Sequence, residues 1–313
     1  MKKLLIHIIF ILGIIQNYQC QDNAIYDSLI NEINISKDSD KVDAYNNASN
    51  FFYRKSAEKS IEFCNKAIDL AKKIKYDRGI ASSYFEIGNA YDHMGNYDTA
   101  LYFYNMSRSI FTRLNDSASI GKIHISIGNA YFYLGDFESS LTHYIKASSV
   151  FEDIDYPNGL ANSLLGQGNV YYNLGLFDRS LEYFKKALDI YYLLDDKTLI
   201  SYGLHNIGST YQELNNLDMA INYYIKSLEI KKKLGDRFGE AYTLNSLGLI
   251  YADKGIYSTA IDYLNQSLKI RIEIGEIQGI ISNYLNLSDL YISFGKYDNA
   301  DSILNISINM CNQ

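Results

Sequence analysis

The chain has 313 residues, and its 36 acidic side chains outnumber its 29 basic ones, for a formal net charge of −7. This balance argues against a nucleic-acid-binding protein, because binding to phosphates needs clustered lysine and arginine. A hydrophobic fraction of 47% and a single proline, Pro157, argue against extended disorder. The longest basic run is Lys231-Lys232-Lys233, which we interpret as a solvated helix face.

The N-terminus has the order of a secretory signal. Lys2 and Lys3 precede an apolar stretch from Leu4 to Ile15, and a polar run from Gln16 to Gln19 follows. The apolar stretch is too short to span a bilayer. We therefore predict a signal over residues 1–20, a linker or N-terminal helix over 21–40, and an exported protein of the periplasm or cell envelope. An N-terminal core helix or an uncleaved anchor is the alternative.

Cys20 stands where a bacterial lipoprotein carries its acylated cysteine. The residues before it, Asn17 to Gln19, depart from the small or aliphatic residues of a lipobox, so lipidation at Cys20 and cleavage by an ordinary signal peptidase stay open as alternatives. Cys64 and Cys311 complete neither a disulfide framework nor a metal-binding spacing. Cys64 is predicted to be a packed thiol of the core.

A small pattern recurs along the chain every 40 residues. Each copy has a glycine or serine followed three residues later by tyrosine: Gly88 and Tyr91, Gly128 and Tyr131, Gly168 and Tyr171, Gly208 and Tyr211, Gly248 and Tyr251, and Ser288 and Tyr291. A fixed period of this length indicates stacked supersecondary units, each in contact only with its neighbours. We therefore treat the repeats as one elongated domain.

Residues 77–116 serve as the specimen unit. Tyr84, Ile87, Gly88 and Tyr91 have the spacing of one face of an amphipathic helix, which we name helix A. Gly95 then marks a helix end, because glycine tolerates the left-handed conformation found there. A second apolar stripe begins at Ala100 and predicts helix B, antiparallel to helix A.

Small residues recur where the two helices are expected to touch, since small side chains let helix axes approach closely. They are Gly88 and its equivalents, then Ala100, Ser140, Ser180, Ala220, Ala260 and Ala300, then Ser107, Ala147, Ala187, Ser227, Ser267 and Ser307. Between them Tyr104, Tyr144, Phe184 and Tyr224 supply bulk. The tyrosines are therefore predicted to belong mostly to the core.

On these residues the chain resembles the tetratricopeptide-repeat family, whose pattern is Leu/Ile-Gly-x-x-Tyr followed by Ala/Ser-x-x-x-Tyr/Phe. The resemblance implies an all-α fold, a right-handed superhelical α-solenoid of helix pairs. It divides the chain into seven units, at about 41–76, 77–116, 117–156, 157–196, 197–236, 237–276 and 277–313. The first unit is degenerate, with Lys55 in place of the turn glycine.

Two departures from the family pattern are informative. The usual period is about 34 residues, with a proline near the end of helix B, yet Thr112 and Glu152 stand at that position here. Without proline, helix B is predicted to run about one and a half turns further, to turns such as Asn115-Asp116, as in the long-helix variant of bacterial sensors and regulators. At the other end, Asp301 replaces the Leu101-type residue, which suits a terminal repeat. The apolar last helix, from Ile303 to Met310, is a candidate surface for self-association.

The resemblance implies that the inner faces of the A helices line a concave groove that binds a peptide or protein segment. The family's groove positions correspond here to Asn89, Asn129, Asn169, Asn206 and Asn286, with the aromatic neighbours Phe85, Phe132, Tyr133 and Tyr172. Such amides donate and accept hydrogen bonds, so a ladder of them can hold the backbone of an extended peptide. The alternative is that the asparagines belong to the repeat consensus or cap local backbone.

Acidic residues lie at the same groove positions. Glu213, Asp253 and Asp289 make the later part acidic and Lys122 stands almost alone, so a free carboxylate terminus is not the expected ligand. We interpret Glu86 and Asp92 as solvated groove positions rather than a catalytic pair.

The sequence has no metal-binding histidine motif, nucleophile elbow or phosphate loop. We therefore predict a non-enzymatic interaction scaffold of a bacterial cell envelope, with no cofactor, no metal and no nucleic-acid partner, and with membrane contact only through the N-terminus. The alternative is a sensory or regulatory module that works with a separate signalling partner such as a histidine kinase. A cytoplasmic peptide-controlled regulator or phosphatase would need a larger N-terminal bundle than residues 21–40 provide.

Overall fold

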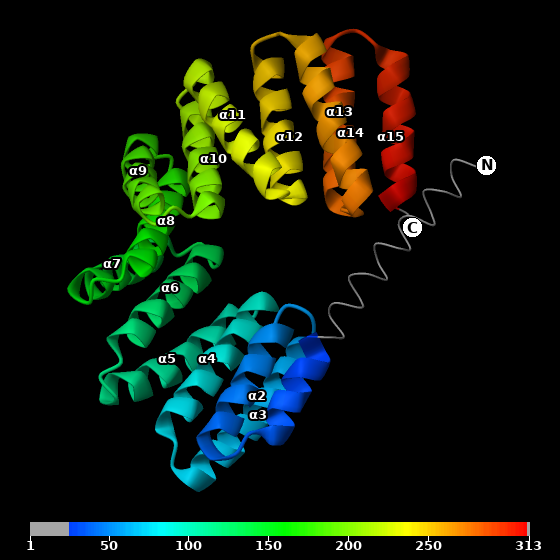
Figure 1. The fold of residues 1–313 in the computed structure, drawn as a ribbon. Helices are drawn as coiled ribbons and strands as arrows, with labels where there is room; N and C mark the ends of the chain where they lie inside the picture. The colour runs from blue at the N-terminus through cyan, green and yellow to red at the C-terminus, as the bar shows by residue number, and fades with distance from the viewer. Residues whose placement is uncertain (1–24, 312–313) are drawn as a thin grey trace. The chain divides into compact units, whose positions relative to one another are not determined.

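The structure is a computed structural model, and it describes residues 25–311. Every regular element in that range is an α-helix, which confirms the predicted all-α class (Figure 1). Residues 25–35 form the first described helix. The chain then divides into two compact units, which meet in sequence between Val170 and Tyr171, inside one helix.

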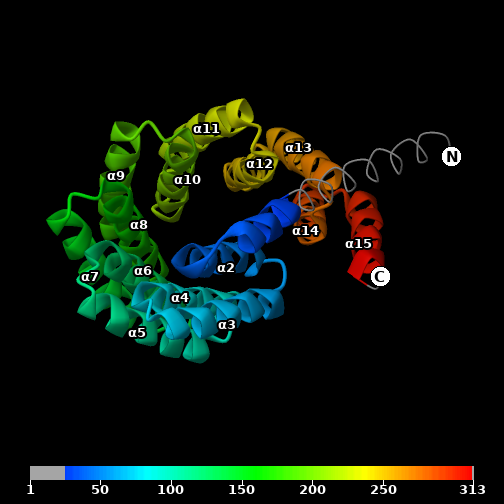
Figure 2. The same cartoon turned by 60° about the horizontal axis from the view of Figure 1, so that its bottom comes forward.

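After residues 25–35, helices A and B alternate along the chain. The helices of the first unit are α2 (Asp38–Phe52), α3 (Ala57–Ile74), α4 (Asp77–His93), α5 (Tyr97–Arg113), α6 (Ser117–Tyr133), α7 (Phe137–Asp153) and most of α8 (Pro157–Asn173). Those of the second are α9 (Phe177–Leu193), α10 (Lys197–Glu213), α11 (Leu217–Leu234), α12 (Arg237–Asp253), α13 (Tyr257–Ile274), α14 (Ile277–Ser293) and α15 (Tyr297–Cys311). Within each unit, an A helix packs on the B helix that follows it, as α12 and α13 do in Figures 1 and 2.

The predicted turns and the long helix B are both confirmed. Gly95 has a φ of 75° and Asn215 a φ of 56°, the left-handed conformation that ends helix A. Helix α5 continues to Arg113, and Asn115, with a φ of 54°, makes the turn. The next helix starts at once, because the Asp116 side chain accepts a hydrogen bond from the backbone N–H of Ser119. Helix B is therefore longer than in the usual repeat because nothing in its sequence stops it earlier.

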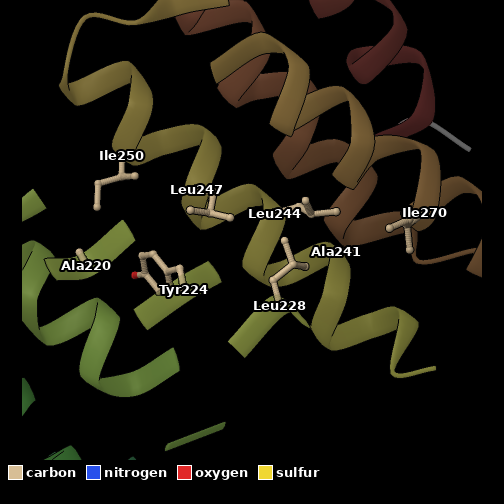
Figure 3. Close-up of a cluster of buried hydrophobic side chains, with 8 residues drawn as sticks. All are labelled: Ala220, Tyr224, Leu228, Ala241, Leu244, Leu247, Ile250 and Ile270. Carbon is tan, nitrogen blue, oxygen red and sulfur yellow. The ribbon is translucent and has the colours of Figure 1, made fainter. Parts of the chain in front are cut away.

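The predicted close approach of the A and B helices is also confirmed. A Cβ atom added at Gly88 would lie 2.5 Å from Cε1 of Tyr104, which leaves room only for glycine. The ring of Tyr144 fits between two A helices, and a Cβ at Gly128 or Gly166 would lie 3.1 Å or 2.3 Å from it. In the second unit, Ala220, Tyr224 and Leu228 of α11 pack with residues of α12 and with Ile270 of α13 (Figure 3). The tyrosines at this position are thus core residues.

The interpretation of the basic run was wrong for one residue. Lys232 and Lys233 are exposed, but only 1% of Lys231 is accessible. Its Nζ atom donates a hydrogen bond to Oγ1 of Thr243 at 3.0 Å and lies 4.9 Å from the centre of the Tyr202 ring. Burial lowers the pKa of Lys231 to about 8. The 40-residue period places this lysine on the buried stripe of helix B, and that constraint prevails over the charge.

The predicted signal and Cys20 lie outside the described residues. Among residues 25–311, no helix combines the length and the hydrophobicity needed to cross a bilayer. Cys64 is a buried free thiol, as predicted, and it donates to Oγ of Ser49 at 2.9 Å. Asp301 is exposed on α15, and self-association through that helix stays a prediction.

Candidate functional site

The predicted groove residues fall in both units, and each unit is described by itself. Phe85 and Asn89 on α4, Asn129, Phe132 and Tyr133 on α6, and Asn169 on α8 belong to the first unit. Tyr172 at the end of α8, Asn206 on α10 and Asn286 on α14 belong to the second. Only the six predicted residues of the first unit can therefore be described as parts of one surface.

Two of the predicted asparagines are held by buried tyrosines. The hydroxyl of Tyr104 donates to Oδ1 of Asn89 at 2.9 Å, and the hydroxyl of Tyr144 donates to Oδ1 of Asn129 at 2.5 Å. These amides therefore satisfy buried hydroxyl groups of the repeat itself. The same contact also fixes each amide in one orientation.

The amino ends of these amides differ. Nδ2 of Asn89 donates to Oε2 of Glu86 at 3.1 Å. Asn129 is exposed, and within residues 25–311 its Nδ2 group donates to no protein atom. Asn169 is half-buried and has an interaction partner of its own. Phe184 stands at the position equivalent to Tyr144 in the repeat of Asn169, and it has no hydroxyl group to donate. Asn129 is thus the amide best placed to donate to a ligand.

The aromatic residues near these amides are unequally accessible. Tyr133 is 65% exposed, and its ring stacks on Tyr97 with centres 5.7 Å apart. Phe132 is half-buried against Phe137, and Phe85 is half-buried against Tyr104. Tyr133 is therefore the main aromatic side chain that a ligand can contact without rearrangement.

In the second unit, the inner faces of successive A helices are joined by polar contacts. Tyr172 donates to Oε1 of Glu213 at 3.1 Å, and Nδ2 of Asn286 donates to Oδ1 of Asn245 at 3.0 Å. Both contacts join residues 41 positions apart, one repeat plus one residue. The sequence contains this regular offset, but the sequence analysis did not predict Asn245 as the hydrogen-bond partner of Asn286. Asn206 is half-buried on α10.

Sequence reasoning also missed two exposed tyrosines of the second unit. Tyr202 on α10 and Tyr242 on α12 are 41% and 50% exposed, and they occupy the same repeat position. The ring of Tyr242 lies 4.9 Å from that of the buried His205. The 40-residue spacing of these tyrosines was the available signal.

The interpretation of Glu86 and Asp92 as solvated was wrong. Both residues are half-buried on α4. Burial raises the pKa of Glu86 to about 7, although the hydrogen bond from Asn89 opposes the shift. Burial also raises the pKa of Asp92, whose Oδ1 atom is buried and has no hydrogen-bond partner in the described part of the chain. The neighbouring repeats cover these carboxylates, which spacing along one helix does not reveal.

One histidine pair joins α6 to α7. Nδ1 of His124 and Nδ1 of His143 are 3.0 Å apart, and burial lowers the pKa of both residues to about 4. Within residues 25–311, no group of three histidine, cysteine, aspartate or glutamate side chains is arranged to hold a metal ion. The two imidazoles therefore act as partners for one another.

Comparisons with solved structures show the same fold. The apo form of RapI matches with a TM-score of 0.68 and 14% identity, over 87% of this chain and 98% of that one. The Rap conjugation gene regulator of plasmid pLS20, in complex with the Phr* peptide, matches with a TM-score of 0.62 and 17% identity, over 88% and 74%. A STAND signal-transduction ATPase with a tetratricopeptide repeat sensor, from Pyrococcus horikoshii, matches with a TM-score of 0.66 and 15% identity, over 94% and 46%. At these identities the likeness concerns the fold alone.

The family comparison covers most of the repeats. A model of the tetratricopeptide repeat matches residues 41–113, 119–192 and 199–273, and a second model of this repeat matches residues 281–312. No curated protein sequence matches the chain. The helix pairs, the left-handed turns and the glycine–tyrosine contacts agree with the matched pattern. The chain therefore belongs to the tetratricopeptide-repeat family, an α-solenoid fold that supports protein–protein interaction modules.

Proposed function

We propose that residues 25–170 bind an extended peptide or protein segment on the exposed surface of α4, α6 and α8, and that the protein is a non-enzymatic interaction scaffold. The observation that carries the proposal is the state of Asn129. Asn129 is an exposed residue whose Oδ1 is held by the buried Tyr144, and its Nδ2 has no protein partner in the described residues. A donor fixed in this way matches a backbone carbonyl of a partner.

Asn129 is suited to binding because its side chain is already held in one orientation. A side chain that is already held in its bound orientation loses little conformational entropy when a ligand arrives. Tyr133, which lies on the same helix, adds an exposed aromatic ring, the residue type most enriched at the centre of interfaces. Amide donors grip the peptide backbone, whereas the ring supplies apolar contact area.

Two solved structures with a similar fold support a peptide-binding function. One structure with a similar fold is a Rap regulator in complex with a peptide, and another is a Rap protein complexed with a competence and sporulation factor. Their sequences are 17% and 12% identical to that of this chain.

The test uses random peptides displayed on phage and selected on the purified protein. Changing Asn89, Asn129 and Asn169 together to alanine is expected to weaken the selected peptides roughly ten- to hundredfold, since each lost hydrogen bond contributes about 0.5–1.5 kcal/mol. Fluorescence anisotropy of labelled peptides measures the affinity, and circular dichroism checks that helicity is unchanged.

A matched control changes three exposed asparagines elsewhere in the first unit, Asn65, Asn105 and Asn158, to alanine. This variant should bind as the wild type does. The proposal fails if the wild type retains no peptide, or if the Asn89, Asn129 and Asn169 variant binds as tightly as the control.

We further propose that the protein is exported to the periplasm or cell envelope. The support is the order of Lys2, Lys3 and the apolar stretch up to Ile15. Fractionation combined with mass spectrometry of the mature N-terminus separates an acylated Cys20 from ordinary signal cleavage. Recovery of the chain from the cytoplasm alone, with Met1 still present, would contradict export.

A second candidate function is that of a regulatory module that responds to a peptide and acts on a separate signalling partner such as a histidine kinase. It is favoured by the similar folds of the Rap regulator and of the ATPase with a repeat sensor. Chemical crosslinking in cells, with and without a selected peptide, discriminates the two. A kinase captured in only one of these states supports regulation, whereas a partner captured equally in both supports a scaffold.

A further inference from the structure

Two carboxylates converge on a buried tyrosine in the first unit. Glu86 and Asp92 both raise the pKa of Tyr104 through their charge, in addition to the larger effect of its burial. Asn89 lies between them on α4 and bonds to both Glu86 and Tyr104. The carboxylates therefore lie on the same helix as Asn89, one repeat before Asn129.

Neither carboxylate forms an ion pair in the part of the chain that the structure describes. In residues 25–311 no ion pair includes Glu86 or Asp92. The titratable groups that face Glu86 are Cys64 of α3 and Tyr104 of α5, and those that face Asp92 are His93, Tyr104 and Tyr144 of α7. Among these only His93 acts to lower a carboxylate pKa.

Burial of an unpaired carboxylate costs free energy, and a hydrogen-bonded counter-charge removes that cost. The buried Oδ1 of Asp92, which has no hydrogen-bond partner in the described residues, is a second and independent sign of a missing donor. Native structures rarely keep such an atom without a reason. A donor that carries positive charge satisfies both observations at once.

The surface around these carboxylates favours the same kind of ligand. Lys122 is the one lysine or arginine at the groove positions of α4 and α6. The nearby Phe85 and the exposed Tyr133 offer aromatic rings, which attract cations at their faces. The corresponding positions of α10, α12 and α14 carry Glu213, Asp253 and Asp289 and no lysine or arginine, so the second unit by itself has the same charge bias.

We propose that Glu86 and Asp92 bind a lysine or arginine side chain of the peptide partner, one repeat before the backbone contact of Asn129. The assignment rests on the proposed peptide-binding function and names the chemistry of its ligand. Sequence-independent amide contacts would hold the peptide, and the carboxylates would select those with a cationic residue at one position.

The test begins with the phage-selected peptides and changes each lysine or arginine in turn to glutamine. One such position is expected to weaken binding to the wild type at least about tenfold. The variants Glu86→Gln and Asp92→Asn, which keep side-chain size, should bind the parent peptide more weakly and should no longer distinguish it from its glutamine version. Glu138→Gln, an exposed carboxylate at the start of α7, is the matched control and should keep the full discrimination.

Proton release on peptide binding tests whether Glu86 contacts the cation, because a purely structural role of Glu86 would not produce it. Burial raises the pKa of Glu86 to about 7 and a nearby cation lowers it, so binding at pH 7 should release a fraction of a proton. Titration calorimetry in buffers of different ionisation enthalpy measures this number. The release should vanish in Glu86→Gln and persist in Glu138→Gln.

The outcomes separate this inference from the proposed function. Selected peptides without cation dependence, or unchanged discrimination in both carboxylate variants, overturn the inference and leave peptide binding intact. If the wild type retains no peptide, the proposed function and this inference fail together. Weaker binding of every peptide by the Asn89, Asn129 and Asn169 variant, with cation selectivity lost only in the carboxylate variants, supports both.

Discussion

The two units fill one repeat position, near the end of helix B, with side chains of opposite chemistry. In the first unit the position holds Phe111 and Phe151, which are 4% and 0% exposed. In the second unit it holds Lys231 and Arg271, which are 1% and 6% exposed. Tyr191, at the same position of α9 in the second unit, is also buried, so the change from a ring to a cation occurs between α9 and α11.

Phe151, Lys231 and Arg271 each lie against a glycine of the A helix that follows. A Cβ at Gly159 would lie 2.5 Å from the Phe151 ring, and one at Gly279 would lie 2.4 Å from Nη1 of Arg271. The cations have acidic neighbours, since Asp236 raises the pKa of Lys231 against the larger effect of burial, and Nε of Arg271 lies 3.4 Å from Oε2 of Glu276. The repeat thus fixes a buried space near the end of helix B, and either a ring or a partnered cation can fill it.

The largest expected effect is in the first unit. Phe151→Ala leaves a cavity between α6 and α8 and should lower the free energy of unfolding by about 3–5 kcal/mol. Urea denaturation followed by circular dichroism measures it, with Tyr102→Ala, whose side chain is 62% exposed, as the control. A loss no greater than that of the control would contradict the view that this unit depends on the ring.

The second effect concerns Lys231 and depends on pH. Its folded pKa of about 8 is below the reference value of 10.5, so between these values the unfolded chain binds the proton and the folded chain does not. Stability from this group therefore rises with pH across that window, and it is lost below it. Relative to Lys231→Met, the wild type should gain on the order of 3 kcal/mol from pH 8 to 10.5.

The neighbouring Lys232→Met is the control for that experiment, because Lys232 is exposed. The difference between wild type and this control should stay flat over the same pH range. A flat difference for Lys231→Met as well would show that Lys231 is not buried in its neutral form.

A third comparison uses two glycines. Gly166→Ala places a Cβ 2.3 Å from the rigid ring of Tyr144 and should destabilise the first unit by about 1–3 kcal/mol. Gly203→Ala in the second unit meets a methyl group of Leu188 at 3.2 Å, and the gain in helix propensity, up to about 1 kcal/mol, should offset the contact. Denaturation midpoints of the two variants test this, and a loss for Gly203→Ala equal to that of Gly166→Ala would contradict it.

The smallest effect is expected at an ion pair common to both units. Lys66–Glu62 in α3 and Lys186–Glu182 in α9 are exposed pairs one helical turn apart, each at 2.6 Å. Glu62→Gln and Glu182→Gln should each leave the denaturation midpoint within experimental scatter of the wild type, because water and salt screen such pairs. A clear loss in one unit alone would place the difference between the units at the surface instead of in the interior.

Much of the fold was predictable because its signals are local. The spacing of Tyr84, Ile87, Gly88 and Tyr91 predicts helix A, and Gly95 predicts its end, from residues that are neighbours in sequence. For the candidate site, the sequence predicted which positions belong to it but not which atoms are available to a ligand. Which end of Asn129 is available depends on the hydroxyl of Tyr144, on another helix, and the sequence shows no hydrogen bonds.

By itself the sequence determined the repeat: the 40-residue period, the helix pairs, the left-handed turns and the family, all of which follow from short-range periodicity and backbone preference. The tertiary structure decided which groups are buried. It placed Lys231 in the core, covered Glu86 and Asp92, and tied Asn89 and Asn129 to buried tyrosines. These states depend on side chains from neighbouring helices that exclude water, and exclusion of water is a property of the packed array rather than of any one repeat.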